Sequence, residues 1–315
     1  MNPIPQTMQA WVIRGYGGAE AMRLENIAVP RPGPGELLLR VEVAGVNPAD
    51  WKIRAGLLQE AHPLAFPRVL GRDCVGTVVG LGQGCEGFSL GERVLAVADT
   101  LRDGTHAEFT LVSGAMAAPV PAPLAAADAA CLGVSGMSAW IPLVEIAALQ
   151  PGQRVLIHAG AGGVGGLAIQ IARHMGAEVL ATCGSANAEY CASLGAHRVI
   201  DYTREQFESV ALGCDVVLDS IGGEVHRRSF AALKPGGLLV RLTAAPVDPT
   251  PPRDDVRVVR AEIRASTARL AKLLEWAAAG FIRPQVGRVF ALAEAREAYA
   301  LSEGGHARGK IVLRV

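Results

Sequence analysis

Five glycines fall within the nine residues HAGAGGVGG (158–166), directly after the apolar run RVLI. Gly160, Gly162 and Gly165 satisfy the spacing GxGxxG, a helical stretch with the sequence LAIQIARHM follows them, and a second strand-like run begins at Glu178. In that context the first glycine permits a tight turn, the second lets a pyrophosphate approach the backbone, and the third lets helix and strand pack closely. The stretch therefore predicts a dinucleotide site at the start of a helix. Its expected contacts are Gly160, Ala161, Gly162, Gly163, Val164 and Gly165.

Apolar, strand-like runs alternate with helical stretches from about residue 150 onward. This alternation predicts βαβ units around a parallel sheet. The stretch STARLAKLLEWAAAG then predicts a helix, because its leucines recur at helical spacing between a Ser266 N-cap and a Gly280 stop. The expected strands cover residues 155–159, 178–182, 197–201, 215–220, 238–243 and 256–263.

Short apolar runs broken by Gly and Pro make up the chain from residue 8 to about residue 125. Strands at that spacing predict an antiparallel barrel or sandwich. The last residues, KIVLRV, predict one more strand that is half-buried, because Ile311, Leu313 and Val315 recur at every second position. With 315 residues, the chain is long enough for two parts that each have a core, so an α/β protein is expected.

Charge and hydropathy exclude several classes of protein. Lysine plus arginine and aspartate plus glutamate both number 30, and the pI is near 7.1, so no basic field for a nucleic acid is present. The most apolar stretches, such as residues 113–142, are rich in Ala, Pro and Gly and are interrupted by Asp128, whereas a membrane-spanning helix needs roughly 20 mostly apolar residues. The opening MNPIPQTMQA lacks the pattern of a signal peptide. We therefore expect a cytoplasmic protein without nucleic-acid or membrane partners. The six cysteines contain no CxxC pair, which predicts buried, reduced thiols.

The end of the second expected strand bears on the choice between NAD and NADP. An Asp or Glu there would bind the ribose hydroxyls of NAD and repel a 2′-phosphate, but residues 182–187 contain no acid. NADP is therefore predicted, with Ser185 and Asn187 as contacts. Tyr202 and Arg204 follow the third strand, where they would either close over the phosphate or belong to a solvated loop.

Further candidate cofactor contacts lie at the ends of later strands, where open α/β sheets bind ligands. Gly222 and Gly223 follow the fourth expected strand, and Leu242 and Thr243 lie at the end of the fifth. These residues would contact the cofactor mainly through their backbone.

Several motifs together resemble the medium-chain dehydrogenase/reductase superfamily, in its quinone oxidoreductase or zeta-crystallin-like branch. They include AGVNPADWKIRAG (44–56), FPRVLGRDCVGTVVGLG (66–82), LGAHRVIDYT (194–203), LKPGGLLV (233–240) and GHARGKIVLRV (305–315). The resemblance implies a GroES-like β-barrel catalytic domain of residues 1–125 and 263–315. It also implies a Rossmann dinucleotide-binding domain, with a doubly wound parallel sheet, of residues 126–262. By the same resemblance, subunits would pair as a homodimer through the edge of the Rossmann sheet.

Two residues within these motifs speak against a catalytic metal. Zinc alcohol dehydrogenases of the same superfamily carry a cysteine and a histidine where this sequence has Asn47 and Arg72. Arginine has no lone pair to offer, so no metal ligands are expected. Without zinc, charge that builds up on a substrate oxygen must be spread by conjugation. The resemblance therefore implies hydride transfer from NADPH to a quinone or an α,β-unsaturated carbonyl compound.

The resemblance also places candidate catalytic residues. Asn47 would bond a substrate oxygen, or it is an ordinary turn residue before a proline, and Asp50 would order the same loop. Lys52 would contact the nicotinamide ribose and stabilise enolate charge, or it is a surface lysine. Ser138 stands where relatives have a threonine near the nicotinamide carboxamide, with a small helix residue as the alternative.

Two other function classes stay open at this point. The chain could be a relative of the zinc-type alcohol dehydrogenases, although Asn47 and Arg72 disfavour that interpretation. It could also be a non-catalytic NADP-binding protein, because a fold alone does not determine function. His106 and His158 have no partner at metal spacing and are expected to be structural.

Overall fold

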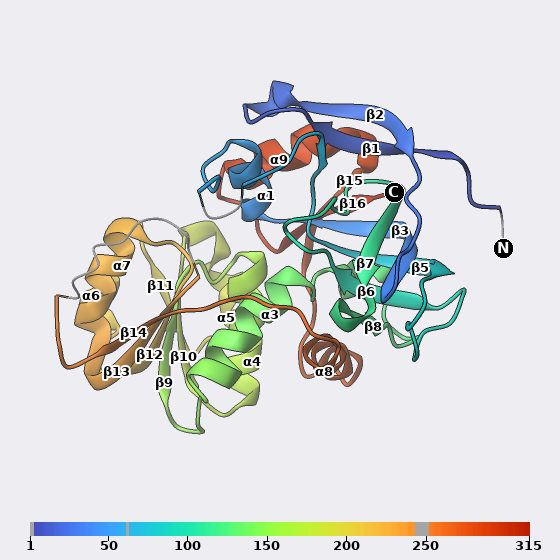
Figure 1. Ribbon diagram of the computed structural model, residues 1–315. Coiled ribbons are helices and arrows are strands. Elements are labelled where there is room, and N and C mark those ends of the chain that lie inside the picture. Colours follow the sequence, from blue (N-terminus) through green and yellow to red (C-terminus); the bar gives the residue numbers. More distant parts are fainter. Residues whose placement is uncertain (1–2, 61–62, 243–251) are drawn as a thin grey trace. The chain divides into compact units, whose positions relative to one another are not determined.

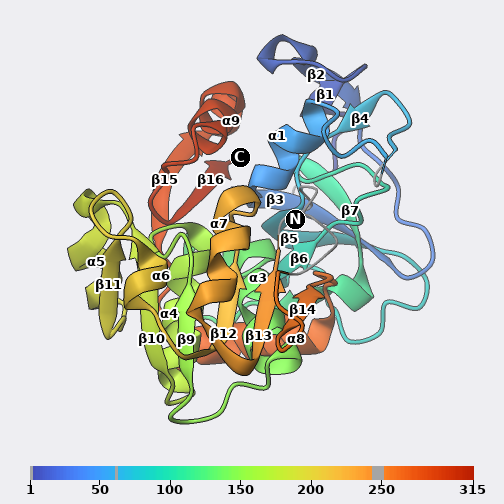
Figure 2. The same cartoon turned by 90° about the vertical axis from the view of Figure 1, so that its left-hand side faces the viewer.

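The computed structural model describes residues 3–60, 63–242 and 252–315. The chain divides into two compact units, whose elements are labelled in Figures 1 and 2. Helix α3 (Val134–Trp140) leads from one unit into the other. We call Met1–Ser135, Ala265–Ala279 and Pro284–Val315 the first unit, and Gly136–Arg264 with Gly280–Arg283 the second unit.

The second unit is built on a parallel sheet. Its described strands are β9 (Arg154–Ile157), β10 (Glu178–Cys183), β11 (Arg198–Asp201), β12 (Cys214–Asp219), β13 (Leu233–Arg241) and β14 (Arg257–Arg260). Its described α-helices are α4 (Gly163–His174), α5 (Ala188–Ser193), α6 (Phe207–Val210) and α7 (Gly223–Ser229). Figure 1 shows α4 and α5 on one face of the sheet and α6 and α7 on the other.

The strand order is β11-β10-β9-β12-β13-β14, and all neighbouring pairs are parallel. This is the predicted doubly wound Rossmann sheet, and each of the six predicted strands is present. The order reverses between β9 and β12, and open sheets of this kind bind ligands at the carboxyl ends of the strands beside such a reversal. The glycine-rich loop lies at that point, because it directly follows β9.

Burial explains why these runs become strands. Val155, Leu156 and Ile157 of β9 are fully covered, as expected for a central strand with helices on both faces. β13 begins earlier than expected, at Leu233, because Leu233 already pairs with Cys214 of β12. After a register shift, the pairing resumes between Val216 and Leu238.

Antiparallel sheets make up most of the first unit. Three strands pair in the order β2-β1-β4; in the larger sheet the order is β15-β16-β3-β5-β6-β8, and β7 also pairs with β3. Among the described strands of this unit, only the pairing of β15 with β16 is parallel, so the predicted GroES-like architecture is confirmed. The strands are β1 (Thr7–Ile13), β2 (Met22–Ala28), β3 (Glu36–Val46), β4 (Arg68–Val69), β5 (Asp73–Leu81), β6 (Arg93–Val97), β7 (Phe109–Ser113), β8 (Ala117–Pro119), β15 (Val286–Ala291) and β16 (Lys310–Arg314).

The described α-helices of the first unit include the one predicted after the parallel sheet. They are α1 (Pro48–Arg54), α2 (Ala126–Ala130), α8 (Thr267–Ala278) and α9 (Ala295–Glu303). In α8 the Ser266 hydroxyl accepts a hydrogen bond from the Arg269 amide at 3.4 Å, and Gly280 follows the helix with a positive φ of 78°. Both predicted end signals are therefore confirmed.

The C-terminal strand differs from its prediction in one respect. β16 is present, but Ile311, Val312 and Leu313 are all buried, so the expectation of a half-buried strand is wrong. The reason is its place in the sheet: β16 lies between β15 and β3, and it is covered on both faces.

All six cysteines are free, and all except Cys85 are buried. The predicted buried thiols are thus present at five of the six positions. Among the described helices, none combines the length and the apolar character that crossing a bilayer requires.

Candidate functional site

The glycine-rich loop joins β9 to α4 in the second unit. A Cβ atom at Gly165 would lie 2.1 Å from the carbonyl oxygen of Ala159, and one at Gly160 would lie 3.0 Å from Cβ of Ala181. Gly165 is therefore required for the close packing of loop and helix, and Gly160 lies in tight contact with β10. Gly162 is the N-cap of α4, and a Cβ atom there would meet, among described residues, only the Ala159 oxygen, at 3.4 Å. The space over the helix N-terminus can thus receive an anion.

The other predicted loop contacts lie around the same space. Ala161 is buried, whereas Gly163 and Val164, in the first turn of α4, are partly exposed. The amides of Gly160 and Gly162 already bond the carbonyls of Thr182 and Ala159, so the donors left for an anion are the amides of the first turn of α4. This geometry fits the pyrophosphate of a dinucleotide, which needs close approach to amides and a helix N-terminus.

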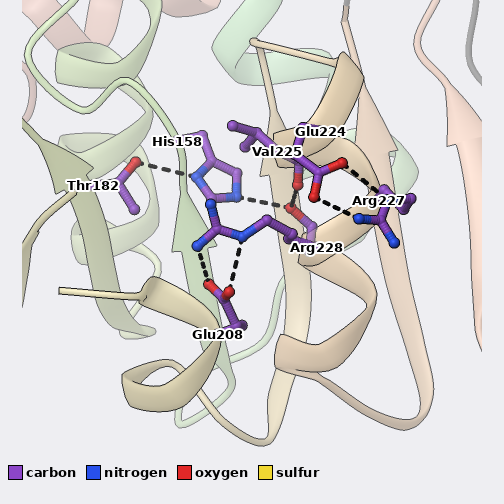
Figure 3. Close-up of polar contacts among 8 residues, drawn as sticks. His158, Thr182, Glu208, Glu224, Val225, Arg227 and Arg228 are labelled. Atoms are coloured by element: carbon purple, nitrogen blue, oxygen red, sulfur yellow. Dashed lines mark hydrogen bonds and ion pairs between the residues drawn. The ribbon is translucent and has the colours of Figure 1, made fainter. Parts of the chain in front are cut away.

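His158 directly follows β9 at the start of this loop, and its polar contacts are drawn in Figure 3. Its Nε2 lies 2.9 Å from the Ser229 hydroxyl, which itself donates to the carbonyl of Val225 at 2.6 Å. Ser229 therefore accepts from Nε2–H, and Nδ1 accepts from the Thr182 hydroxyl at 3.1 Å. Burial lowers the pKa of His158 to about 4, so the ring is neutral near pH 7. The histidine ties β9 to β10 and α7, in agreement with the structural role expected for it.

Two ion pairs lie on the same side of the sheet as His158, and neither of them bonds its ring nitrogens. Figure 3 shows Glu208 bonded to Arg228 by two hydrogen bonds of 2.8 and 2.6 Å, and Glu224 bonded to Arg227 on the same helix. The ring of His158 packs against the Phe207 ring at 4.7 Å between centroids. Among the described residues, the ring nitrogens of His158 bond only the neutral hydroxyls of Thr182 and Ser229.

A carboxylate lies where the cofactor prediction expected only neutral groups. Asp201, at the end of β11, accepts hydrogen bonds from the Ser185 hydroxyl and from the amide and hydroxyl of Thr203. The Ser185 bond is the main cause of its lowered pKa. Arg204 lies 3.6 Å from the same carboxylate, and its side chain is otherwise exposed. The parallel pairing of Cys183 with Asp201 produces this proximity, which the segment 182–187 alone does not reveal.

Two further predicted contacts lie beside this carboxylate. Tyr202 is 51% exposed, and its hydroxyl would lie 3.4 Å from a Cβ atom at Gly184. Its ring therefore flanks the segment that carries Ser185. Asn187 is the N-cap of α5, without a capping bond from its side chain.

A buried aspartate organises the ends of β12 and β13. One oxygen of Asp219 accepts from the amides of Ile221 and Gly222, both at 2.9 Å, and the other lies 2.8 Å from Nδ1 of His226. Its carbonyl accepts from the Leu242 amide at 2.9 Å. Asp219 thereby places the predicted contacts Gly222 and Leu242 next to each other. Sequence reasoning missed Asp219, and Thr243 lies outside the described residues.

In the first unit, Asn47 belongs to a buried cluster of three side chains, which we call the Asn47 cluster: Asn47, Asp73 and Lys310. The Asn47 amide nitrogen donates to Asp73 at 2.7 Å, and its oxygen accepts from the Lys310 ammonium at 2.5 Å. Lys310 lies 3.6 Å from Asp73, and both side chains are almost completely buried. The Val134 amide donates to the second oxygen of Asp73 at 2.8 Å. The Asn47 amide is therefore held in one orientation.

Small residues make room for this cluster. A Cβ atom at Gly45 would lie 2.5 Å from Asp73 and 2.8 Å from Lys310, and one at Gly133 would lie 2.6 Å from Asp73. Asp50, in the first turn of α1, accepts from the backbone N–H of Asn47 at 2.7 Å, and burial raises the pKa of this carboxyl group. Asp50 therefore orders the start of α1, as predicted from its motif.

His106 is a second buried, structural histidine. Its Nε2 lies 3.1 Å from the Gly45 carbonyl, which can only accept, so Nε2 carries the hydrogen. Its Nδ1 then accepts from the Tyr299 hydroxyl at 3.0 Å. The ring joins α9 to the end of β3.

Two basic side chains of the first unit have few partners. Lys52, on α1, is half-buried, and its ammonium lies 5.6 Å from the centroid of the Trp51 ring. Among described residues it makes no hydrogen bond or ion pair. Arg72 is also half-buried, and its Nε is buried without a hydrogen-bond partner in the described part of the chain. Ser138 lies on α3 in the second unit and is 6% exposed.

The positions expected to hold zinc in metal-dependent relatives do not suit a metal here. The Asn47 amide is engaged by Asp73 and Lys310, and the Arg72 guanidinium has no lone pair. Across residues 3–60, 63–242 and 252–315, no three His, Cys, Asp or Glu side chains gather closely enough to hold a metal ion. The first unit therefore offers zinc no ligand set at these positions.

Comparison with known proteins agrees with this architecture. Residues 33–123 match the family model of the alcohol dehydrogenase GroES-like domain, and residues 194–313, which contain neither Asn47 nor Arg72, match that of a zinc-binding dehydrogenase. The chain is 31% identical to a chloroplastic quinone-oxidoreductase of Triphysaria versicolor, with 97% of this chain and 98% of that protein covered. It is 34% identical to an NADPH-dependent alkenal/one oxidoreductase of Arabidopsis thaliana, covering 98% of this chain and 80% of that protein.

A solved structure of a mycobacterial protein complexed with NADPH has a TM-score of 0.89 and 30% identity to this chain, with 98% and 100% of the two chains covered. Fold, glycine-rich loop and sequence similarity over nearly the whole length thus point to the same group of oxidoreductases. The chain belongs to the medium-chain dehydrogenase/reductase superfamily, in its quinone oxidoreductase branch.

Proposed function

We propose that this protein is an NADPH-dependent, metal-independent reductase that transfers a hydride to a quinone or an α,β-unsaturated carbonyl compound. The observation that carries the proposal is the open space beside Gly162 at the N-terminus of α4, which fits the pyrophosphate of a dinucleotide. The acceptor class is supported by the relatives that are named quinone and alkenal/one oxidoreductases. When bound, NADPH supplies the hydride.

Residues of the second unit would hold the cofactor. The loop from Gly160 to Gly165 would bind the pyrophosphate, and Ser185, Asn187 and Tyr202 would surround the adenosine ribose and its phosphate. Gly222, Leu242 and Thr243 would contact the nicotinamide half through their backbone, and Ser138 would contact the carboxamide. All of these residues are contacts that the sequence predicts.

The preference for NADPH over NADH depends on a balance of charges. Asp201 would repel a 2′-phosphate, but Ser185 and Thr203 already occupy its oxygens, and Arg204 lies beside it. The exposed Arg204 guanidinium can turn to the phosphate, because the 3.6 Å ion pair with Asp201 is the only side-chain contact that holds it among the described residues. We therefore retain NADPH as the cofactor and treat Asp201 as the residue that limits the preference.

On the substrate side, Asn47 and Lys52 are the proposed catalytic residues. One N–H of the Asn47 amide is used by Asp73, and Lys310 holds the amide oxygen, so the second N–H is left to donate to a substrate oxygen. The half-buried Lys52 ammonium, which lies near the Trp51 ring and makes no hydrogen bond or ion pair with a described residue, would stabilise developing enolate charge.

A direct test follows NADPH oxidation by absorbance, with a naphthoquinone and a small enone offered in parallel and a chelator present. Turnover with either acceptor that survives the chelator supports the proposal, and the same assay with NADH gives the cofactor preference. Failure of the purified protein to bind NADPH would refute it. Tight NADPH binding without turnover would instead favour a non-catalytic NADP-binding protein.

We also propose that the chain forms a homodimer through an edge of the six-stranded sheet, as the resemblance implies. β14 is one such edge, and β13 is its only partner among the described strands. Light scattering on the purified protein tests this, and a monomer at micromolar concentration would overturn it.

A further inference from the structure

Arg72 lies between β4 and β5 in the first unit and directly precedes Asp73, the first residue of β5. Its carbonyl oxygen accepts a hydrogen bond from the Ala98 amide at 2.6 Å, which holds its backbone where β5 begins and β6 ends. Its side chain is only partly exposed, and its Nε is buried without a partner among the described residues. It forms no ion pair with any of them either. The guanidinium is thus a half-buried cation that no described side chain neutralises by direct contact.

Nearby carboxylates do not neutralise this cation by contact. Asp50, Asp73 and Asp99 all act on its charge from a distance. Each of them accepts a hydrogen bond from a backbone amide, and Asp73 also pairs with Lys310. Burial lowers the pKa of Arg72, yet arginine stays protonated in proteins, so the charge remains.

A half-buried charge without a partner is costly, and an anionic group or a polarised oxygen would offset that cost. The guanidinium offers planar N–H donors, which match a carbonyl or enolate oxygen well. Asn47 directly follows β3, and its side-chain amide donates to Asp73, the residue after Arg72. Asp50 and Asp73, which both accept a hydrogen bond from Asn47, also act on the charge of Arg72, so the guanidinium lies in the neighbourhood of Asn47.

We propose that Arg72 is a catalytic residue that binds the carbonyl oxygen of the acceptor and stabilises the negative charge that develops on it. This inference rests on the proposed function. A hydride that adds to the β-carbon of an enone pushes the electron pair of the C=C bond toward the carbonyl, which forms an enolate oxygen beside Arg72. Water then protonates the α-carbon, and the cofactor is left as NADP⁺. With a quinone, the same charge develops on the oxygen of a hydroquinone anion, which water protonates.

This role differs from that of a purely structural arginine, and the chain contains a matched example. Arg68, on β4, is also half-buried with a buried Nε that lacks a partner among described residues. Its Nη1, however, donates to the Leu101 carbonyl at 2.8 Å, so its guanidinium is held by the backbone. Arg68→Gln therefore removes a comparable amount of buried guanidinium without touching the proposed oxyanion contact.

The test compares wild type, Arg72→Gln, Arg72→Lys and Arg68→Gln in two independent assays. The first measures kcat and KM with an enone under saturating NADPH. The second measures binding of lawsone, a hydroxynaphthoquinone that is an anion at neutral pH, in the presence of NADP⁺, so that no turnover is needed. NADPH affinity and the unfolding transition of each variant serve as folding checks.

We expect Arg72→Gln to lower kcat by about 100- to 1,000-fold, as removal of an oxyanion-hole donor does, with NADPH affinity unchanged. Lawsone affinity should fall by about tenfold or more, the size of a lost charged hydrogen bond. Arg72→Lys should retain part of both, because it keeps the charge but loses the planar fork. Arg68→Gln should keep both values within about threefold of wild type, a difference below about 1 kcal/mol.

Rescue by an added cation separates chemistry from structure. In Arg72→Ala, guanidinium chloride at a non-denaturing concentration should restore part of kcat, and urea at the same concentration should not. If Arg72→Gln binds lawsone as tightly as wild type, or if wild type does not bind it, the inference is overturned. If wild type reduces no acceptor but binds lawsone through Arg72, the proposed reductase function fails while the anion site stands.

Discussion

The glycine-rich loop of the second unit and the Asn47 cluster of the first unit are both tightly packed. The loop is packed through its main chain, whereas the Asn47 cluster is packed through its side chains. At the loop, a Cβ atom on Gly165 would lie 2.1 Å from a backbone oxygen, so the constraint comes from the main chain. In the Asn47 cluster, three side chains from distant segments neutralise and orient one another. A site built from the backbone is therefore encoded by a short segment of sequence, whereas a site built from side chains depends on the whole fold of its unit.

The largest expected effect concerns the buried ion pair. Lys310→Met should lower the free energy of unfolding by about 3–5 kcal/mol, because Asp73 would stay buried without its counter-charge. Denaturant titration followed by tryptophan fluorescence measures the change. Lys272→Met is the control, since its exposed pair with Glu275 should contribute less than about 1 kcal/mol. A loss for Lys310→Met as small as the control would show that the side chains of the Asn47 cluster do not hold the first unit together.

The next effect is a pH dependence of the second unit. The pKa of His158 is lowered from 6.5 to about 4 in the folded state. Between these values the unfolded chain binds a proton that the folded protein does not, so stability should fall as pH decreases from about 6.5 to about 4. The predicted loss is about 2–3 kcal/mol, at up to about 1.36 kcal/mol per pH unit. His158→Gln should flatten this part of the stability curve, and an unchanged slope in that variant would exclude His158 as its source.

A substitution in the loop tests the backbone side of the comparison. Gly165→Ala should cost about 1–3 kcal/mol of stability and weaken NADPH binding, because its Cβ would collide with the Ala159 carbonyl and push α4 away from the loop. Fluorescence titration with NADPH and thermal unfolding measure the two effects. Gly15→Ala is the matched control, since no described atom lies within 4 Å of its Cβ position. Equal NADPH affinity in both variants would contradict the assigned role of Gly165.

The smallest effect sharpens the choice of cofactor. Asp201→Asn should raise the preference for NADPH over NADH by about tenfold, or about 1.4 kcal/mol, because it removes the negative charge beside Ser185 and frees Arg204. The ratio of kcat/KM for the two cofactors is the measurement. Arg204→Gln should move the ratio in the opposite direction. A shift toward NADH in Asp201→Asn would mean that Asp201 supports phosphate binding through its hydroxyl partners.

Local pattern predicted much of this protein. The strands and the cap of α8 follow from the spacing of apolar residues and from Ser266, and the loop follows from three glycines within six positions. These signals act over a few residues, so they survive without knowledge of tertiary contacts. The motifs also placed Asp50 correctly as the residue that orders the start of α1.

Local sequence patterns did not predict the charged residues that come together across neighbouring strands. Asp201 lies near Ser185 because β10 and β11 pair in parallel, and no spacing rule in the segment 182–187 reveals that carboxylate. Lys310 was one of four lysines in the sequence, but its partner Asn47 is 263 positions away. Burial of β16 on both faces likewise depends on its two neighbouring strands.

The parallel sheet, the antiparallel strands of the first unit and the anion-binding loop could all be predicted from the sequence. Each depends on the local spacing of apolar residues or on the conformational freedom of glycine. Only the tertiary structure decided which charges are paired. It buried Lys310 against Asp73 and Asn47, placed Asp201 beside Ser185, and left the Arg72 guanidinium without a partner among the described residues. Electrostatic energies depend on distance and burial in three dimensions, and neither quantity is written in the order of residues along the chain.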